Sequence, residues 1–196
     1  MRLRTSRLEI IPFSRRQLEL FLTDPAGAAR EIGAIYGTVP FEVMETQRNL
    51  YAMKLRIIDM NPEAWLFATA WQIVSRYSRL IVGEIGFKGI HPNGEVELGY
   101  STRHEHRCRA IMTEAVKEIC RFAFEQDKFI IKTVSALTRP DNLASEAVLK
   151  NNGFVKKGTL FGKNYWIMTR SDFFANAKQR NQGNGEHTEY DSESDR

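Results

Sequence analysis

One segment, residues 129–154, constrains the fold of this chain more than any other. Its first nine residues are rich in β-branched and aromatic side chains and predict a buried strand. Pro140 disfavours helix at the residue before it, and Asp141 or Asn142 can cap a helix whose apolar residues follow at helical spacing. Gly153 is suited to end that helix. A strand, a helix and a second strand in so short a run predict an α/β domain.

A β-hairpin is predicted upstream. Residues 80–90 and 95–101 have the composition of strands, and the pair Asn93-Gly94 between them is a strong signal for a tight turn. Residues 110–125 follow, with apolar side chains on one stripe and charged ones on the other. This pattern predicts an amphipathic helix packed on the sheet.

The N-terminal third predicts further elements of both kinds. Residues 41–59 contain no Pro or Gly and predict one helix, and the apolar run 64–74 predicts a strand. Ser14 and Gln17 have the spacing of a capping box at the start of another helix. The order of elements predicts one α/β domain over residues 1–175, with a mixed, mostly antiparallel twisted sheet flanked by helices on both faces.

Three motifs carry a resemblance to a known family. They are Pro-Asp-Asn-x-x-Ser-x-x-x-Leu-x-x-x-Gly-Phe at 140–154, Gly-Glu-Ile-Gly-Phe at 83–87 and Glu-Val-Glu-Leu-Gly-Tyr at 95–100. Together they resemble the GNAT N-acetyltransferases, and within them the RimJ/RimL-like branch that acetylates N-terminal amines of ribosomal proteins. The resemblance implies a GNAT-like fold and acetyl-CoA as co-substrate. An ordinary strand-helix-strand unit is the alternative explanation of the closing segment, because capping chemistry alone accounts for most of its residues.

The resemblance also implies where coenzyme A binds. At the entrance to the amphipathic helix the family carries Arg/Gln-x-x-Gly-x-Gly/Ala, whose backbone N–H groups meet the pyrophosphate. The aligned residues here are Arg107, Cys108, Arg109, Ala110, Ile111 and Met112. Ala110 replaces the Gly, and it costs about 1 to 2 kcal/mol if this position needs positive φ. Arg103, Arg107 and Arg109 are expected near the phosphates, and a solvated basic loop is the alternative interpretation.

The cofactor arm and the reacting groups are expected on the central strands and the closing helix. The resemblance implies Leu98, Gly99, Tyr100 and Asn142 beside the pantetheine arm. Glu97 is the predicted general base and Glu84 its alternative, although either carboxylate can also be a surface charge or an ion-pair partner. Many GNAT enzymes use a Tyr as the acid where this chain has Leu149, so Ser145 is the predicted acid; it can equally bond its own helix backbone.

Composition limits the remaining possibilities. No apolar run of the 196 residues approaches the roughly 20 of a membrane span, and the first residues lack the hydrophobic region of a signal peptide, so we expect a cytoplasmic protein without a membrane partner. The spacing of Cys108 and Cys120 predicts reduced thiols and no metal site. Residues 176–196, with five acidic and three basic side chains, predict a disordered polar tail.

The sequence therefore predicts an acetyl-CoA-dependent N-acetyltransferase acting on a primary amine of a small molecule or a protein N-terminus. Two other classes remain. One is a noncatalytic binding module that kept the fold while its phosphate loop changed. The other is a nucleic-acid- or ribosome-associated protein that uses the net charge of +4, although no nucleic-acid motif is present and such a partner is disfavoured. A homodimer is left open.

Overall fold

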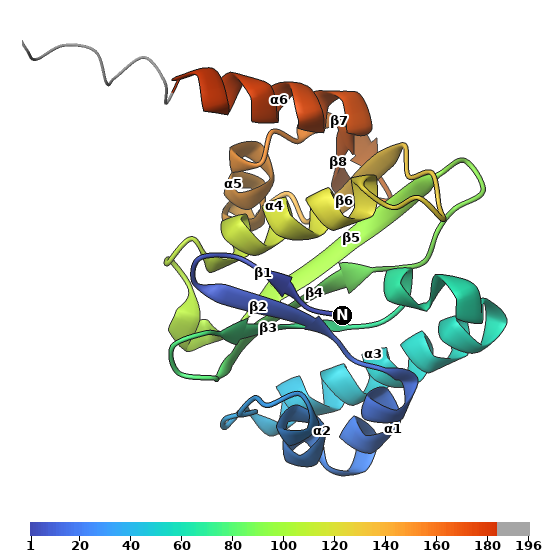
Figure 1. The fold of residues 1–196 in the computed structure, drawn as a ribbon, viewed down its shortest axis with the longest axis vertical. Coiled ribbons are helices and arrows are strands. Elements are labelled where there is room, and N and C mark those ends of the chain that lie inside the picture. Colours follow the sequence, from blue (N-terminus) through green and yellow to red (C-terminus); the bar gives the residue numbers. More distant parts are fainter. Residues whose placement is uncertain (184–196) are drawn as a thin grey trace, which may run out of the picture.

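The computed structural model describes residues 1–183, which form one eight-stranded sheet (Figure 1). The strands lie in the order β1-β2-β3-β4-β5-β6-β8-β7. Their bounds are β1 Leu3–Arg4, β2 Leu8–Pro12, β3 Trp71–Ser75, β4 Ile81–Phe87, β5 Glu95–Thr102, β6 Thr133–Thr138, β7 Val155–Leu160 and β8 Lys163–Thr169. Neighbouring strands are antiparallel except β5 and β6, which are parallel. The prediction of a mixed, mostly antiparallel sheet is confirmed.

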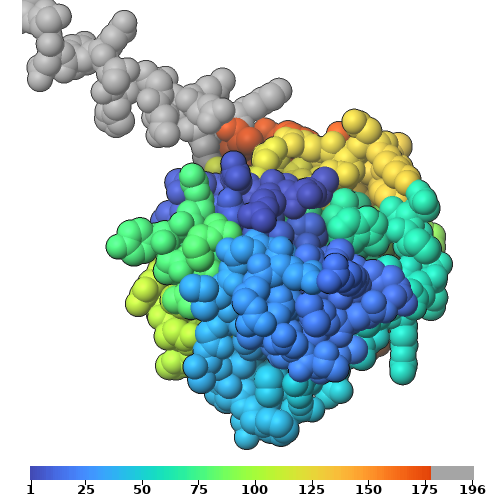
Figure 2. Space-filling view, turned by 60° about the horizontal axis from the view of Figure 1, so that its bottom comes forward, coloured from blue at the N-terminus to red at the C-terminus, as the bar shows by residue number. Residues whose placement is uncertain are grey.

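Helices cover both faces of the sheet, as predicted. The helices α1, α2 and α3 lie on one face and form a continuous surface there, whereas α4 and α5 lie on the other (Figures 1 and 2). Their bounds are α1 Arg15–Thr23, α2 Pro25–Glu31, α3 Phe41–Met60, α4 Ile111–Phe124, α5 Leu143–Asn151 and α6 Arg170–Gly183, with short 3-10 helices η1 Pro62–Phe67 and η2 His104–His106. The predicted capping box at Ser14 and Gln17 is present at the start of α1.

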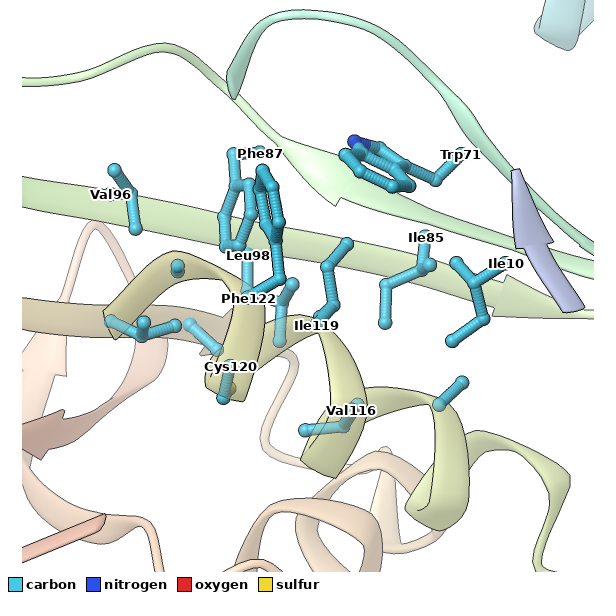
Figure 3. Close-up of a cluster of buried hydrophobic side chains, with 14 of the residues drawn as sticks. Ile10, Trp71, Ile85, Phe87, Val96, Leu98, Val116, Ile119, Cys120 and Phe122 are labelled. Carbon is cyan, nitrogen blue, oxygen red and sulfur yellow. The ribbon is translucent and has the colours of Figure 1, made fainter. Parts of the chain in front are cut away.

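A hydrophobic core lies on each face of the sheet, between the strands and the helices that cover them. The first lies between the sheet and α4, where Phe87 and Leu98 of the strands meet Ile119 and Phe122 of the helix (Figure 3). The second lies under α1 to α3 and includes Phe21 and Tyr51, whose ring centroids are 4.5 Å apart. Each large side chain buried in this way contributes about 1.5 to 3 kcal/mol. Apolar packing therefore covers both faces of the central strands, except where polar side chains take its place.

Two predicted strands begin later than expected. Most of the apolar run 64–74 is not strand, because η1 occupies its first residues and β3 begins at Trp71. Pro62 starts this 3-10 helix, and the indole N–H of Trp71 donates to the Leu66 carbonyl at 2.9 Å, which holds the corner. Likewise β6 begins only at Thr133. Periodicity alone cannot separate a short apolar strand from a buried turn of helix.

The C-terminal helix extends into the segment predicted to be a tail. Helix α6 runs to Gly183, past residue 176, and Phe173 in its first turn packs on Phe124 of the first core with ring centroids 5.4 Å apart. The rest of that prediction, over residues 184–196, lies outside the described residues. Within residues 1–183 no helix combines the length and hydrophobicity needed to cross a membrane.

Candidate active site

The two parallel strands part in the middle of the sheet. Strands β5 and β6 pair from Glu95 opposite Thr133 to Leu98 opposite Ala136, and beyond that point β5 pairs with β4 and β6 with β8. A hollow of about 210 Å³ lies where they part. This splay hollow is lined by Gly99, Tyr100, Leu137, Asn142, Ser145 and Lys163, among others. The parted strand edges leave backbone N–H and C=O groups that a ligand can bind.

A larger hollow of about 650 Å³ lies under α3. Among the residues that line this α3 hollow are Gln47, Lys54, Glu84, Gly99, Arg103 and Arg107. It shares Lys88, Gly99 and Tyr100 with the splay hollow, so the two meet over β5. Its volume lies within the range of about 300 to 1,000 Å³ that is usual for small-molecule sites.

A pair of glycines forms the floor where the hollows meet. Gly99 of β5 lies opposite Gly86 of β4. A Cβ atom built on Gly99 would meet no atom within 4 Å, so this part of the strand faces open space. Glycine within a strand is typical of a place where a ligand approaches the backbone closely.

The two candidate carboxylates lie on opposite sides of this floor. Glu97 lines the splay hollow and forms an ion pair with Lys88, which directly follows β4. Glu84 lines the α3 hollow and is paired with Ser101, four residues further along β5. At about 3.3 Å per residue, their backbones are about 13 Å apart. The expectation that both carboxylates line one cleft is therefore replaced by two adjoining hollows, each with its own carboxylate.

A chain of buried polar groups holds Glu84. The Tyr51 hydroxyl donates to the Glu84 carboxylate, and the Gln47 amide donates to the same oxygen at 3.2 Å. The Gln72 amide in turn donates to the Tyr51 hydroxyl at 2.7 Å, and the Tyr36 hydroxyl donates to Gln47 Oε1 at 2.6 Å. Burial raises the pKa of Glu84, and the hydrogen bond from Tyr51 opposes that shift.

Lys54 is a second buried charge in the wall of the α3 hollow. Its ammonium donates to the carbonyls of Ala68, Thr69 and Phe87 at 3.0 to 3.1 Å. Burial lowers the pKa of Lys54 to about 8. Sequence reasoning missed Gln47, Tyr51 and Lys54 as site residues, although their spacing places all three on one face of α3.

The loop before α4 has the positive-φ backbone on which the predicted cost of Ala110 depends. Cys108 and Ala110 have φ of 58° and 55°, a left-handed region that favours glycine. Helix α4 begins at Ile111 without a side-chain cap, which leaves backbone N–H groups of its first turn available to an anion. Arg7 holds the loop, since its guanidinium donates to the Arg109 carbonyl at 3.1 Å and pairs with Glu114.

The predicted cofactor residues divide into three groups. Arg107, Cys108, Arg109 and Ala110 are exposed on the loop, with Ile111 half-buried after them. Met112 and Leu98 are buried in the first core, and Leu98 also lines the splay hollow. Gly99, Tyr100 and Asn142 line the splay hollow.

The closing helix brings Ser145 to the splay hollow through its cap. The Asn142 side chain accepts from the Ser145 backbone N–H at 3.1 Å, and the Tyr100 hydroxyl donates to the Ser145 carbonyl at 3.2 Å. Burial raises the pKa of Tyr100 to about 12. Leu149 stands where the resemblance would place a Tyr that acts as the general acid, and it is fully buried. Sequence reasoning also missed Lys163, which reaches the same hollow from β8.

The parted strands, the two hollows and the uncapped helix start define an α/β domain of the acetyltransferase class. The chain belongs to the acetyltransferase (GNAT) family, because the sequence profile of that domain matches residues 7–155.

Relatives agree with this assignment. The uncharacterized N-acetyltransferase YjdG of Bacillus subtilis (strain 168) is 29% identical over 99 residues, which is 50% of this chain and 58% of that protein. The ribosomal-protein-S5-alanine acetyltransferase of Vibrio fischeri covers 88% of this chain and 98% of its own, with a TM-score of 0.62 and 17% identity. RimL, a ribosomal L7/L12 α-N-protein acetyltransferase solved with coenzyme A, covers 88% and 99% with a TM-score of 0.60 and 17% identity. At such identities the two structures show a shared fold.

Proposed function

We propose that this protein transfers the acetyl group of acetyl-CoA to a primary amine. The observation that carries the proposal is the parting of β5 and β6 over Gly99, beside the uncapped start of α4. One feature accommodates an extended arm that bonds to strand edges, and the other binds an anion by backbone N–H groups and the helix dipole. Together they match a ligand that has a pyrophosphate at one end and a thioester at the other.

In this proposal the loop before α4 binds the phosphates of acetyl-CoA, and the splay hollow binds its arm. Arg107 and Arg109 supply charge at the phosphates, and the N–H groups from Ala110 to Met112 bind them. The arm then follows Leu98, Gly99 and Tyr100 toward Asn142. This path ends at the glycine floor, where the splay hollow meets the α3 hollow that would hold the acceptor.

The chemistry needs a neutral amine, a polarised carbonyl and a proton for the leaving thiolate. In our proposal the amine nitrogen attacks the thioester carbon, Glu97 takes the amine proton directly or through water, and backbone N–H groups at the parted strands bind the oxyanion. The C–S bond then breaks, and Ser145 supplies the proton to the sulfur. Glu84, in the α3 hollow, is the alternative base.

We further propose a protein N-terminal amine as the acceptor. RimL and the Vibrio fischeri enzyme support this by their fold, and both are described as acetyltransferases of ribosomal proteins. The α3 hollow, which opens between α3 and the sheet, has room for the first residue of such a chain.

The test measures binding and turnover separately. Titration calorimetry with acetyl-CoA gives the affinity, and release of the CoA thiol, followed with a thiol-reactive dye in the presence of amine peptides, gives the rate. We expect both binding and amine-dependent thiol release. Failure to bind acetyl-CoA would refute the proposal.

A noncatalytic CoA-binding module is the second candidate. The observation that favours it is the pair of non-glycine residues, Cys108 and Ala110, in left-handed backbone at the phosphate loop. Acetyl-CoA binding without thiol release for any amine would support this module over the enzyme.

A further inference from the structure

Arg103 lies in the wall of the α3 hollow, and its guanidinium forms no ion pair within the part of the chain that the structure describes. Its Nη2 atom is buried and has no hydrogen-bond partner, and no carboxylate of residues 1–183 lies within ion-pair distance of its side chain. Its guanidinium carbon lies 4.6 Å from the centroid of the Tyr36 ring. Burial lowers the pKa of Arg103, and the nearby Tyr36, Glu105 and Glu84 oppose that shift. A half-buried guanidinium without a carboxylate beside it, in a ligand-sized hollow, is suited to bind an anionic group.

The position of Arg103 relates it to Glu84. Arg103 follows the last residue of β5, and its backbone N–H donates to the Val82 carbonyl at 3.0 Å. Its side chain lies on the α3 face of the sheet, because it stacks on Tyr36 of the second core. Glu84 lies opposite Ser101 and therefore diagonal to Arg103, about 7 to 8 Å away along the sheet. A carboxylate and an unpaired guanidinium thus face one hollow at the spacing of a small dipolar molecule.

We propose that Arg103 binds an anionic group of the acceptor, a carboxylate or a phosphate, so that the preferred acceptors are primary amines with an anion a few bonds away. This inference rests on the proposed function and narrows its substrate class. The guanidinium can bind such a group through two parallel N–H donors, while the ring of Tyr36 fixes the plane of the guanidinium. In this arrangement the acceptor amine lies nearer to Glu84, the alternative base, than to Glu97.

A phosphate of the cofactor is the other source of an anion. The acceptor is favoured because Arg103 lies over Tyr36 of the second core, whereas the uncapped helix start belongs to α4 on the other face of the sheet. Arg107 of the loop also lines the α3 hollow, so the cofactor needs its own test. The two sources make different demands on Arg103. If Arg103 binds an anion of the acceptor, the effect of replacing Arg103 on kcat/KM depends on the acceptor used. If it binds a cofactor phosphate, that effect is the same for every acceptor.

The experiment compares matched acceptors that differ in one side-chain charge, Ala-Asp-amide against Ala-Asn-amide. With the wild type we expect at least a tenfold higher kcat/KM for the anionic member of the pair, equivalent to about 1.4 kcal/mol. Arg103→Met should remove that preference while the neutral acceptor and the acetyl-CoA affinity stay unchanged. Arg103→Lys should restore part of it. Arg16→Met, which removes the same charge from the surface of α1, should change nothing.

Each other outcome overturns the inference. Equal use of both members by the wild type removes the anion from the recognition, whether or not the variants fold. Loss of both members together with weaker acetyl-CoA binding in Arg103→Met assigns the guanidinium to the cofactor. Turnover of the neutral acceptor shows that the proposed function stands even when the anion preference fails. Absence of turnover with every acceptor refutes the proposed function, and this inference with it.

Discussion

Ala110→Gly should stabilise this protein, which is the opposite of what glycine does in the interior of a helix. Ala110 is exposed and precedes α4 with φ of 55° and ψ of 14°. An L-residue in this left-handed region costs about 1 to 2 kcal/mol, and glycine removes that strain. Glycine also makes the unfolded chain more flexible, which costs about 0.4 to 1 kcal/mol. The net expectation is a gain of about 0.5 to 1 kcal/mol in the free energy of unfolding.

Thermal unfolding followed by circular dichroism measures this change. For a chain of this size, 1 kcal/mol shifts Tm by about 2 to 4 °C, so we expect a rise of about 1 to 4 °C. Ala52→Gly in the interior of α3 is the control, because helical backbone there gives no strain to relieve. That substitution should lower the free energy of unfolding by about 1 kcal/mol. A fall in Tm for Ala110→Gly similar to the control would refute the reasoning, since it would mean that the loop backbone is unstrained.

Three further predictions concern charged groups. Glu97→Gln should lower the rate of acetyl transfer at least about tenfold with little change in acetyl-CoA affinity, whereas normal turnover there together with collapse in Glu84→Gln would transfer the role of base. Arg107→Ala combined with Arg109→Ala should weaken acetyl-CoA binding several-fold in low-salt calorimetry, and an unchanged affinity would contradict the proposed phosphate site. The pKa of Lys54 falls from 10.5 unfolded to about 8 folded, so between these values the unfolded chain binds more protons and stability rises with pH. Denaturant unfolding should show that rise, at most about 3 kcal/mol, in the wild type relative to Lys54→Met, and parallel pH profiles would contradict it.

Local chemistry determined much of the fold. The hairpin is specified by Asn93 and Gly94, since Gly94 adopts φ of 81° in the turn that joins β4 to β5. Helix α5 is specified by Asn142, which caps it, and by Gly153, which ends it with φ of 85°. These signals act between residues close in sequence, so they can be recognised without knowing the rest of the structure. The same holds for the apolar stripe of α4.

The candidate site depended on contacts between distant parts of the chain. Sequence identified Glu84 and Glu97 as the carboxylates of two paired strands, but only the packing of α3 on the sheet brought Tyr51 to Glu84 and left Glu97 with Lys88. It likewise placed Arg103 over the ring of Tyr36, a contact that the sequence did not predict. The helix face that carries Gln47, Tyr51 and Lys54 is legible in the sequence, whereas the strand it meets is not. Residue spacing fixes which side chains share a face, and tertiary packing decides what that face contacts.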